Sequence, residues 1–355
     1  MSNSLTLFTQ NYPVQFYNHF NDILKEFIEN LQNKNQFVFI IDENFFHLWK
    51  ESIHWILQFP YYLVPSGEQY KNLQNLEKIW KFFYENQIDR QTIVVGWGGG
   101  VVGDLAGFAA ATYLRGLPFF QIPTTLLSMV DSSIGSKTAI DFLNAKNLIG
   151  AFYSPKKVFI CPQFLTTLPQ RQMLCGQAEM FKHAIIHSKN HLQQIDNIQI
   201  ESIFNSLKIK KYFVEKDPYE KNIRKKLNFG HTIGHALESF AIENYLDLLH
   251  GEAVFWGMLL EMYFFKKIYL ISEKIFFLFL NLIQPYINKI VFNPFQYPAE
   301  DWFRYIKQDK KRLHNGVDMT LILKIGTSKI INIEISKLEV ILKDIIHNHD
   351  GQYSF

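Results

Sequence analysis

The sequence predicts an α/β protein, with a domain of alternating strands and helices in residues 1–165 and a mainly α-helical domain in residues 166–355. In the first part, short β-branched or aromatic runs alternate with helical patterns, which is typical of βαβ units and a mainly parallel sheet. After about residue 166 these runs fade, and apolar residues at helical spacing dominate to about residue 290. Pro162 and Pro169 place the boundary between the two parts.

The predicted strands of the first domain lie at residues 37–41, 61–64, 92–96 and 119–122. Between the second and the third, one set of apolar residues recurs every three or four positions, and it predicts a helix whose apolar stripe covers the sheet. This set is Leu73, Leu76, Ile79, Trp80 and Phe83. In the second domain, the β-type run at 319–325 predicts one short strand.

Composition excludes several classes of protein. The chain has 355 residues, enough for two domains. Its 36 basic and 33 acidic residues leave a net charge of +3, too little for a nucleic-acid-binding protein. Only 19% of the residues are charged while 48% are hydrophobic, which excludes a disordered chain.

The cellular setting follows from what the sequence does not show. It has no apolar run of the length that a membrane helix needs and no secretory leader at its start. Two cysteines, Cys161 and Cys175, are expected to pack as free thiols. We therefore expect a cytoplasmic protein with no membrane partner.

Phenylalanine is unusually frequent, with 33 residues, and we expect it to fill core positions. The same packing role is expected for the phenylalanines that lie inside the motifs described below, which are Phe108, Phe119, Phe152, Phe181 and Phe229.

A glycine motif follows the third predicted strand. Gly98, Gly100 and Gly103 satisfy the pattern G-x-G-x-x-G between a strand and a helix, where backbone N–H groups bind phosphate. The acidic residue that usually binds the ribose about 20 residues later is missing, because residues 105–130 contain no Asp or Glu. Dinucleotide binding and a turn that only packs a helix on a sheet both stay open.

Histidines indicate a metal site in the second domain. His231 and His235 are four residues apart, on one face of a helix, and can converge on one centre. His250, Glu179 and His183 are further candidates. Three protein ligands with an open position suit a catalytic zinc ion. Spacing alone leaves open which three of these five bind metal, and a surface or core role for each histidine.

Several cations lie near glycine or small-residue motifs, and together they would suit a small substrate with several negative charges. They are Arg115, Lys137, Lys146, Lys182, Lys210 and Arg224. Any one of them alone is better explained as a solvated surface charge, so they matter only as a set.

Four segments, at residues 98–152, 176–186, 227–238 and 249–254, closely resemble the 3-dehydroquinate synthases of the shikimate pathway. The resemblance extends from about residue 42 to 311. It implies an N-terminal Rossmann-like α/β domain that binds NAD, a C-terminal helical domain that binds a divalent metal, Zn²⁺ or Co²⁺, and the substrate in the cleft between them. It also implies a homodimer.

The resemblance also implies roles for individual residues. The metal ligands would be Glu179, His231 and His250. The NAD contacts would be Asp42, Asn44, Glu68, Lys71, Gly99, Gly100, Val101, Asp104, Thr124, Thr125 and Thr167, with Lys137 and Lys146 close to both cofactor and substrate. The catalytic and substrate contacts would be Arg115, Asp131, Lys137, Lys146, Asn147, Lys182, Lys210, Arg224, Asn228, His235 and one of Lys310 and Lys311.

The reaction implied is the conversion of 3-deoxy-D-arabino-heptulosonate 7-phosphate, a small anionic sugar phosphate, to 3-dehydroquinate and phosphate. It would proceed by transient oxidation with NAD, β-elimination of phosphate, reduction, ring opening and intramolecular aldol closure. Such an enzyme is a carbon–oxygen lyase that regenerates its NAD.

Two positions depart from the family pattern. Gln172 stands where the family has Glu, which removes a charge, and Ser136 stands where it has Gly, which affects the loop before Lys137.

Other sugar-phosphate cyclases and glycerol-type dehydrogenases are the nearest rival functions, and a catalytically silent scaffold is a third. Simple alcohol oxidation would not need Lys137, Lys146, Lys210 and Arg224 together.

Overall fold

The computed structural model describes residues 6–9, 11–32, 36–143, 145–310 and 316–348. Contacts divide the chain into two compact units. The first comprises residues 1–176 and 198–211, and the second residues 177–197 and 212–355. Each unit is described by itself. The functional division at residue 165 stays a prediction.

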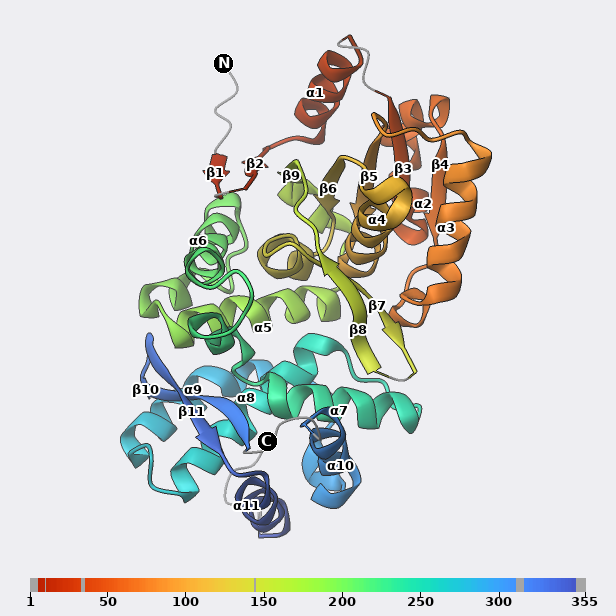
Figure 1. Ribbon diagram of the computed structural model, residues 1–355. Coiled ribbons are helices and arrows are strands. Elements are labelled where there is room, and N and C mark those ends of the chain that lie inside the picture. The colour runs from red at the N-terminus through yellow and green to blue at the C-terminus, as the bar shows by residue number, and fades with distance from the viewer. Residues whose placement is uncertain (1–5, 10, 33–35, 144, 311–315, 349–355) are drawn as a thin grey trace. The chain divides into compact units, whose positions relative to one another are not determined.

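The first unit is built on a seven-stranded sheet with the order β1-β2-β9-β6-β5-β3-β4 (Figure 1). Every neighbouring pair is parallel except β1 and β2. The four predicted strands are present, as β3 (Phe37–Asp42), β4 (Tyr61–Val64), β5 (Ile93–Gly98) and β6 (Phe119–Pro123). The prediction of a mainly parallel sheet is therefore confirmed.

The remaining elements of this unit are three strands outside the prediction, a hairpin and the helices. The strands are β1 (Thr6–Phe8), β2 (Pro13–Phe16) and β9 (Lys157–Ile160), and the hairpin is β7 (Lys137–Phe142) with β8 (Ala145–Phe152). The helices are α1 (Phe20–Gln32), α2 (Glu43–Ile53), α3 (Leu73–Glu85), α4 (Gly100–Thr112) and most of α6 (Ile200–Lys216). Short helical turns span His54–Gln58, Glu68–Tyr70, Tyr113–Arg115, Ser128–Ser132 and Pro162–Thr167.

One face of the sheet is covered by α3 and α4 (Figure 1). Leu76, Ile79 and Phe83 of the predicted stripe are fully buried there, against strand residues such as Val38 and Val94. Leu73 is 44% exposed, so the predicted stripe is wrong at its first position. This residue is the first of the helix, before the stripe reaches the sheet.

The opposite face of the sheet is aromatic, because side chains alternate between the two faces of a strand. Val38 and Ile40 of β3 belong to the aliphatic face, whereas Phe37 and Phe39 contact Phe27 of α1 at 5.1 and 5.9 Å between ring centroids. The rings of Phe120 and Phe159 extend this cluster. Much of the phenylalanine excess therefore forms one layer of the core.

The motif phenylalanines follow the packing prediction with one exception. Phe108, Phe119, Phe181 and Phe229 are buried. Phe152 is 51% exposed, at the end of the hairpin strand β8, so its predicted packing role is wrong. Both cysteines are buried and form no disulfide, as predicted.

The second unit is mainly helical, as predicted. Its helices are the larger part of α5 (Gln170–Ile186), then α7 (His231–Glu243), α8 (His250–Lys267), α9 (Glu273–Ile287), α10 (Ala299–Lys310) and α11 (Ile335–His347). Short helical turns span Lys189–Gln194, Ile223–Asn228 and Pro294–Gln296. The predicted late strand is β10 (Val317–Lys324), and it pairs with an unpredicted strand, β11 (Thr327–Ile333).

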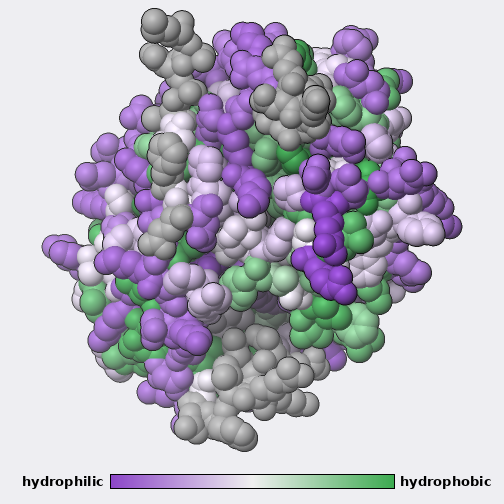
Figure 2. Space-filling view, turned by 45° about the horizontal axis from the view of Figure 1, so that its top comes forward, coloured by the Kyte–Doolittle hydropathy of each residue, from purple (hydrophilic) through white to green (hydrophobic). Residues whose placement is uncertain are grey.

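Among the described residues, no helix has both the length and the apolar character needed to cross a membrane. On the face shown in Figure 2, polar side chains are interspersed with apolar ones. Within the second unit, α8 is buried along nearly its whole length, from Gly251 to Met262.

Candidate functional site

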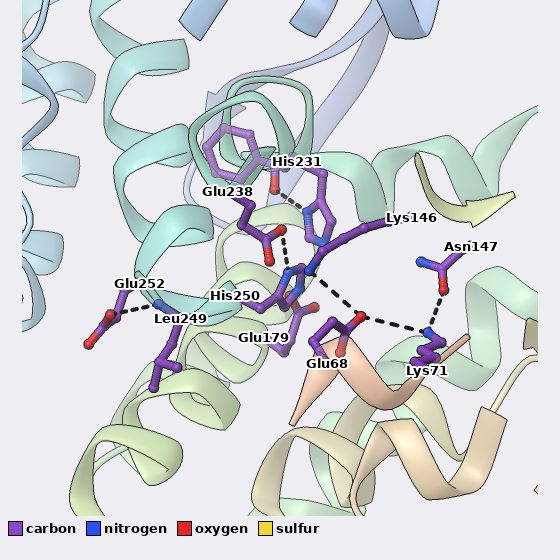
Figure 3. A network of polar contacts seen from close by, with 11 residues as sticks. Glu68, Lys71, Lys146, Asn147, Glu179, His231, Glu238, Leu249, His250 and Glu252 are labelled. Carbon is purple, nitrogen blue, oxygen red and sulfur yellow. Dashed lines mark hydrogen bonds and ion pairs between the residues drawn. The ribbon is translucent and has the colours of Figure 1, made fainter. Parts of the chain in front are cut away.

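Three potential metal ligands converge in the second unit (Figure 3). Glu179 lies in the middle of α5, and His231 and His250 are the first residues of α7 and α8. The Nε2 atoms of His231 and His250 lie 3.5 and 3.9 Å from Oε1 of Glu179. All three ligand atoms are within 4.8 Å of one another, so one cation could reach them together.

The environment of His231 keeps its ring neutral. Burial lowers its pKa well below the usual value, and the neighbouring Lys182, His235 and His250 add to the shift. Its Nδ1 lies 3.2 Å from the carbonyl oxygen of Phe229. Donation from Nδ1 to this carbonyl leaves the lone pair on Nε2, which faces Glu179. A neutral imidazole with this tautomer is a ready metal ligand.

Glu179 provides the test of whether a cation fits. Its side chain is fully buried, and neither carboxylate oxygen accepts a hydrogen bond within the described part of the chain. Lys182, one turn later on α5, forms an ion pair with Oε2. A buried carboxylate is costly unless charges and ligands compensate it. The residues present therefore fit a divalent metal at Oε1.

His235, the fourth candidate, is exposed on α7. Its ring centroid is 5.2 Å from that of His231 and 5.9 Å from that of His250. It also belongs to a second possible ligand group, with Glu238 and His250. Glu238 was absent from the predicted residues, although its position three residues after His235 places it on the same helix face. His183, the fifth candidate, is fully buried on α5.

The two glycines of the histidine motif, Gly230 and Gly234, leave no space for a ligand. A Cβ atom on Gly230 would lie 2.5 Å from Met258 Cγ of α8, and one on Gly234 would lie 3.0 Å from the carbonyl oxygen of Ala253. Gly230 also has a φ of +80°. These glycines allow α7 to pack closely on α8, so helix packing, and not space for a ligand, explains their presence.

A tight loop positions two predicted substrate residues of the second unit. The carboxylate of Asp217 accepts N–H groups of Lys221, Asn222 and Arg224 at 2.9, 2.6 and 3.1 Å. Burial alone would raise the pKa of Asp217, but these hydrogen bonds outweigh it, and the pKa is lowered. Arg224 itself is buried and donates from Nη1 to the Pro218 carbonyl at 2.6 Å.

Asn228 ends the same segment. Its Nδ2 donates to Oε1 of Glu220 at 2.7 Å. Glu220 was not predicted, and its spacing from Asn228 gives no helical or strand signal from which it could have been found.

The predicted NAD residues of the first unit follow the carboxyl ends of parallel strands. Chain order reverses between β3 and β5, because β4 lies on the outer side of β3 while β6 continues beyond β5. Ligands of open α/β sheets bind at such a switch point. Asp42 ends β3, Gly99 follows β5 and Thr124 follows β6. The same edge carries Asn44, Glu68, Lys71, Gly100, Val101, Asp104, Thr125 and Thr167.

Hydrogen bonds fix parts of this edge. Asp42 accepts the N–H of Phe45 at 2.9 Å, and the Ser66 hydroxyl lies 2.8 Å from both of its carboxylate oxygens. The hydroxyl of Thr167 accepts the indole N–H of Trp49 at 2.9 Å.

Lys71 joins the predicted cofactor and substrate residues of the first unit (Figure 3). It is 5% exposed, and its Nζ lies 2.5 Å from Asp104 Oδ2 and donates to Asn147 Oδ1 at 2.5 Å. Glu68 Oε1 lies 3.9 Å from Lys71 Nζ and 3.7 Å from Lys146 Nζ. Burial opposes the charge of Lys71, but Asp104 and Glu68 outweigh it, and the pKa of Lys71 is raised.

The glycine motif has the packing role that the sequence left open, and its role in dinucleotide binding stays a prediction. A Cβ on Gly98 would lie 2.7 Å from Val102 Cβ, and one on Gly103 would lie 2.3 Å from Gln121 Nε2, so these two glycines serve packing of α4. Gly99 is the N-cap of α4 and has no side chain to cap the helix. The first N–H groups of α4 therefore remain suited to an anion.

The other predicted residues differ in their placement. Lys210 Nζ lies 2.5 Å from both Oδ1 and the carbonyl oxygen of Asp131, so these two are brought together. Lys137 begins β7 and is exposed. Arg115 follows the C-terminal end of α4, about 20 Å along the helix from Gly99. It is therefore not brought near the carboxyl ends of the strands, where the predicted NAD residues lie. Lys310 ends α10, and Lys311 lies outside the described residues.

The sequence matches two family models along most of its length. Residues 61–175 match the N-terminal part of 3-dehydroquinate synthase, and residues 176–312 match its C-terminal part. The chain belongs to the 3-dehydroquinate synthase family. The metal-ligand group falls entirely within the C-terminal match.

Relatives support the same assignment. The chain is 40% identical to a 3-dehydroquinate synthase of Dictyoglomus thermophilum, over 87% of this chain and 89% of that one. It is 35% identical to a 3-dehydroquinate synthase of a Thermoanaerobacter species, over 96% and 99% of the two chains.

Solved structures show the fold. A 2-deoxy-scyllo-inosose synthase, complexed with carbaglucose-6-phosphate, NAD⁺ and Co²⁺, has a TM-score of 0.82 at 23% identity, over 96% of this chain and 99% of that one. A 2-epi-5-epi-valiolone synthase from Streptomyces hygroscopicus, with NAD⁺ and Zn²⁺ bound, has a TM-score of 0.82 at 22% identity, over 96% and 98%. A probable glycerol dehydrogenase from Sinorhizobium meliloti reaches 0.63 at 12% identity, over 97% and 99%.

Proposed function

We propose that this protein is a 3-dehydroquinate synthase, which converts 3-deoxy-D-arabino-heptulosonate 7-phosphate to 3-dehydroquinate and phosphate in the shikimate pathway. The observation that carries the proposal is the convergence of Glu179, His231 and His250 inside the segment that matches the C-terminal family model. Identities of 35–40% to synthases, against 22–23% to two other cyclases, favour this substrate over those of the other cyclases.

Glu179, His231 and His250 would hold a divalent metal, Zn²⁺ or Co²⁺, and the strand ends of the first unit would hold NAD. When bound, the metal would supply a Lewis acid for substrate hydroxyl groups, and NAD⁺ would supply a hydride acceptor that is regenerated within the cycle. The bound forms of the two cyclase structures, with NAD⁺ and Co²⁺ or Zn²⁺, support this pair of cofactors.

The side chains of the protein would bind and orient the substrate. Arg224, rigidly held by the Asp217 loop, is suited to a carboxylate or phosphate, since guanidinium binds both in a bidentate manner. Lys137, Lys146 and Lys210 would add compact charges for the same anions. Lys182 is suited to an oxygen anion beside Glu179. The exposed ring of His235 would transfer protons.

Arg115 lies too far from the strand ends to serve the site of its own chain. In a homodimer, which the family resemblance implies, Arg115 would have to act in the partner's site. A dimer of this kind, located in the cytoplasm, is part of the proposal.

The test follows the products. The purified protein with Zn²⁺ or Co²⁺ and NAD⁺ should release one phosphate for each 3-dehydroquinate formed, with no net NADH at 340 nm. This result would also establish the lyase class. Stoichiometric NADH would indicate an alcohol dehydrogenase instead. Absence of phosphate release from the heptulosonate, with turnover of another sugar phosphate, would indicate a different cyclase.

A second experiment tests the ligand assignment. His250→Ala should abolish metal retention, measured by elemental analysis, because it removes one of three ligands. His235→Ala should keep the metal and lose turnover. Equal metal loss in both variants would contradict the assignment.

A further inference from the structure

Glu238 is a buried acid beside the metal-ligand group that the family resemblance did not include. It lies on α7, seven residues after His231 and three after His235, so the three side chains share one helix face. It is only 3% exposed. Its Oε2 lies 3.0 Å from Nδ1 of His250, the first residue of the next helix (Figure 3).

The two nitrogens of the His250 ring face different acids. Nδ1 faces Glu238 at 3.0 Å, and Nε2 faces Oε1 of Glu179 at 3.9 Å. A neutral imidazole carries one proton. With the proton on Nδ1, it is donated to the Glu238 carboxylate, and the Nε2 lone pair points toward Glu179. In the opposite tautomer, the lone pair of Nδ1 would face the negatively charged carboxylate of Glu238, and the two would repel each other. The carboxylate therefore selects the tautomer that a metal at Glu179 requires.

We propose that Glu238 is a positioning residue, which holds His250 in the orientation and tautomer needed to bind the metal. Carboxylates that accept the second N–H of a ligand histidine are a common support of metal sites. The proposal rests on the metal site of the proposed function, and it adds a residue that is not itself a ligand.

A rival arrangement uses Glu238 directly, with His235 and His250 as the other ligands. Two observations favour the positioning role. The separation of 3.0 Å between Nδ1 and Oε2 is a hydrogen-bond distance, whereas two ligand atoms of a tetrahedral zinc ion are about 3.3 Å apart. The rival would also leave the fully buried Glu179 carboxylate without a divalent cation.

Metal affinity tests the proposal without relying on turnover. The full chain is stripped of metal and titrated with Zn²⁺ against a coloured chelator, and separately with Co²⁺ by visible absorption. Glu238→Ala should weaken Zn²⁺ binding about 10-fold to 100-fold. Glu238→Gln should weaken it less, because the amide oxygen still accepts the Nδ1 proton. Glu243→Gln, an exposed carboxylate on the same helix, should match the wild type.

The outcomes separate the possibilities. A weaker affinity with an unchanged Co²⁺ spectrum supports the positioning role. Unchanged affinity in both Glu238 variants overturns it, as does a loss equal to that of His250→Ala with an altered Co²⁺ spectrum, which would make Glu238 a ligand. If Glu238→Ala does not fold, Glu238→Gln carries the test. Failure of the wild type to bind either metal would instead contradict the proposed metal site.

Discussion

Replacement of Glu261 by Gln should change how stability depends on pH. Glu261 is 1% exposed within the apolar helix α8. Burial raises its pKa to about 8, although the N–H groups of Gly230, Thr232 and Ile233 oppose the shift. These groups begin α7, whose N-cap is a glycine without a capping side chain. Glu261 therefore faces the uncapped start of α7 from the neighbouring helix.

The sign and size follow from proton linkage. The pKa is raised from 4.5 in the unfolded chain to about 8 in the folded protein, so the folded state binds more protons between these values. The contribution of Glu261 is full below about pH 4.5 and is lost as the pH rises toward 8. At roughly 1.4 kcal/mol per pH unit, and less as the pH nears 8, the wild type should lose about 2.5 kcal/mol from this group between pH 5.5 and 7.5.

Glu261→Gln removes the titration but keeps the shape. Its free energy of unfolding, relative to that of the wild type, should therefore rise by about 2.5 kcal/mol from pH 5.5 to 7.5. Urea unfolding of the metal-free proteins, followed by tryptophan fluorescence at constant ionic strength, measures this difference. Glu273→Gln, whose side chain is 77% exposed, serves as the control. Parallel pH curves for the wild type and Glu261→Gln would refute the reasoning.

Three further variants test other parts of the structure. Gly257→Ala should destabilise the protein by about 3 kcal/mol and weaken Zn²⁺ binding, because its Cβ would lie 1.9 Å from the Gly230 carbonyl oxygen and displace the start of α7. Urea unfolding measures the first effect and chelator competition the second. Lys71→Met should cost about 3 kcal/mol in urea unfolding by leaving Asp104 without its partner, and the double variant with Asp104→Asn should recover most of it; no recovery would contradict the pairing. Asp217→Asn should lower the thermal midpoint at pH 7 and raise the KM for the heptulosonate. Because the pKa of Asp217 is lowered, its contribution to stability exists above pH 3.8 and is lost as the pH falls further. The difference in thermal midpoint between Asp217→Asn and the wild type should therefore narrow below that pH.

Most of the strands that the sequence predicted have continuous apolar runs, although β9, which has one, was missed. β3, β5 and β6 are buried along most of their length, and a strand covered on both faces has no polar alternation to obscure it. The hairpin of β7 and β8 was missed because much of β8 is exposed, and its sequence mixes Lys146 and Asn147 with apolar residues. Strand β2 begins with Pro13, which is unusual in a strand, and Gln15 interrupts its apolar residues.

The metal-ligand group shows a different limit. Spacing on one helix joins His231 to His235, but the structure joins His231 to His250, which starts another helix. That choice depends on how α7 meets α8, which local periodicity does not contain. Glu238 could have been found, since it is three residues from His235, yet its partner His250 again lies on the other helix.

The contact between α7 and α8 therefore determines the geometry of the metal-ligand group as much as the ligands do. Gly230 and Gly257 let the two helices approach each other closely. Glu261 of α8 faces the first N–H groups of α7, and Glu238 of α7 forms a hydrogen bond with His250 at the start of α8. His231 and His250 are the first residues of these helices, so a shift of either helix start would move a ring nitrogen of the metal-ligand group. Metal affinity should consequently respond to changes in this packing that touch no ligand. Gly257→Ala and Glu238→Ala should both weaken Zn²⁺ binding, but only Gly257→Ala should strongly lower the stability of the metal-free protein.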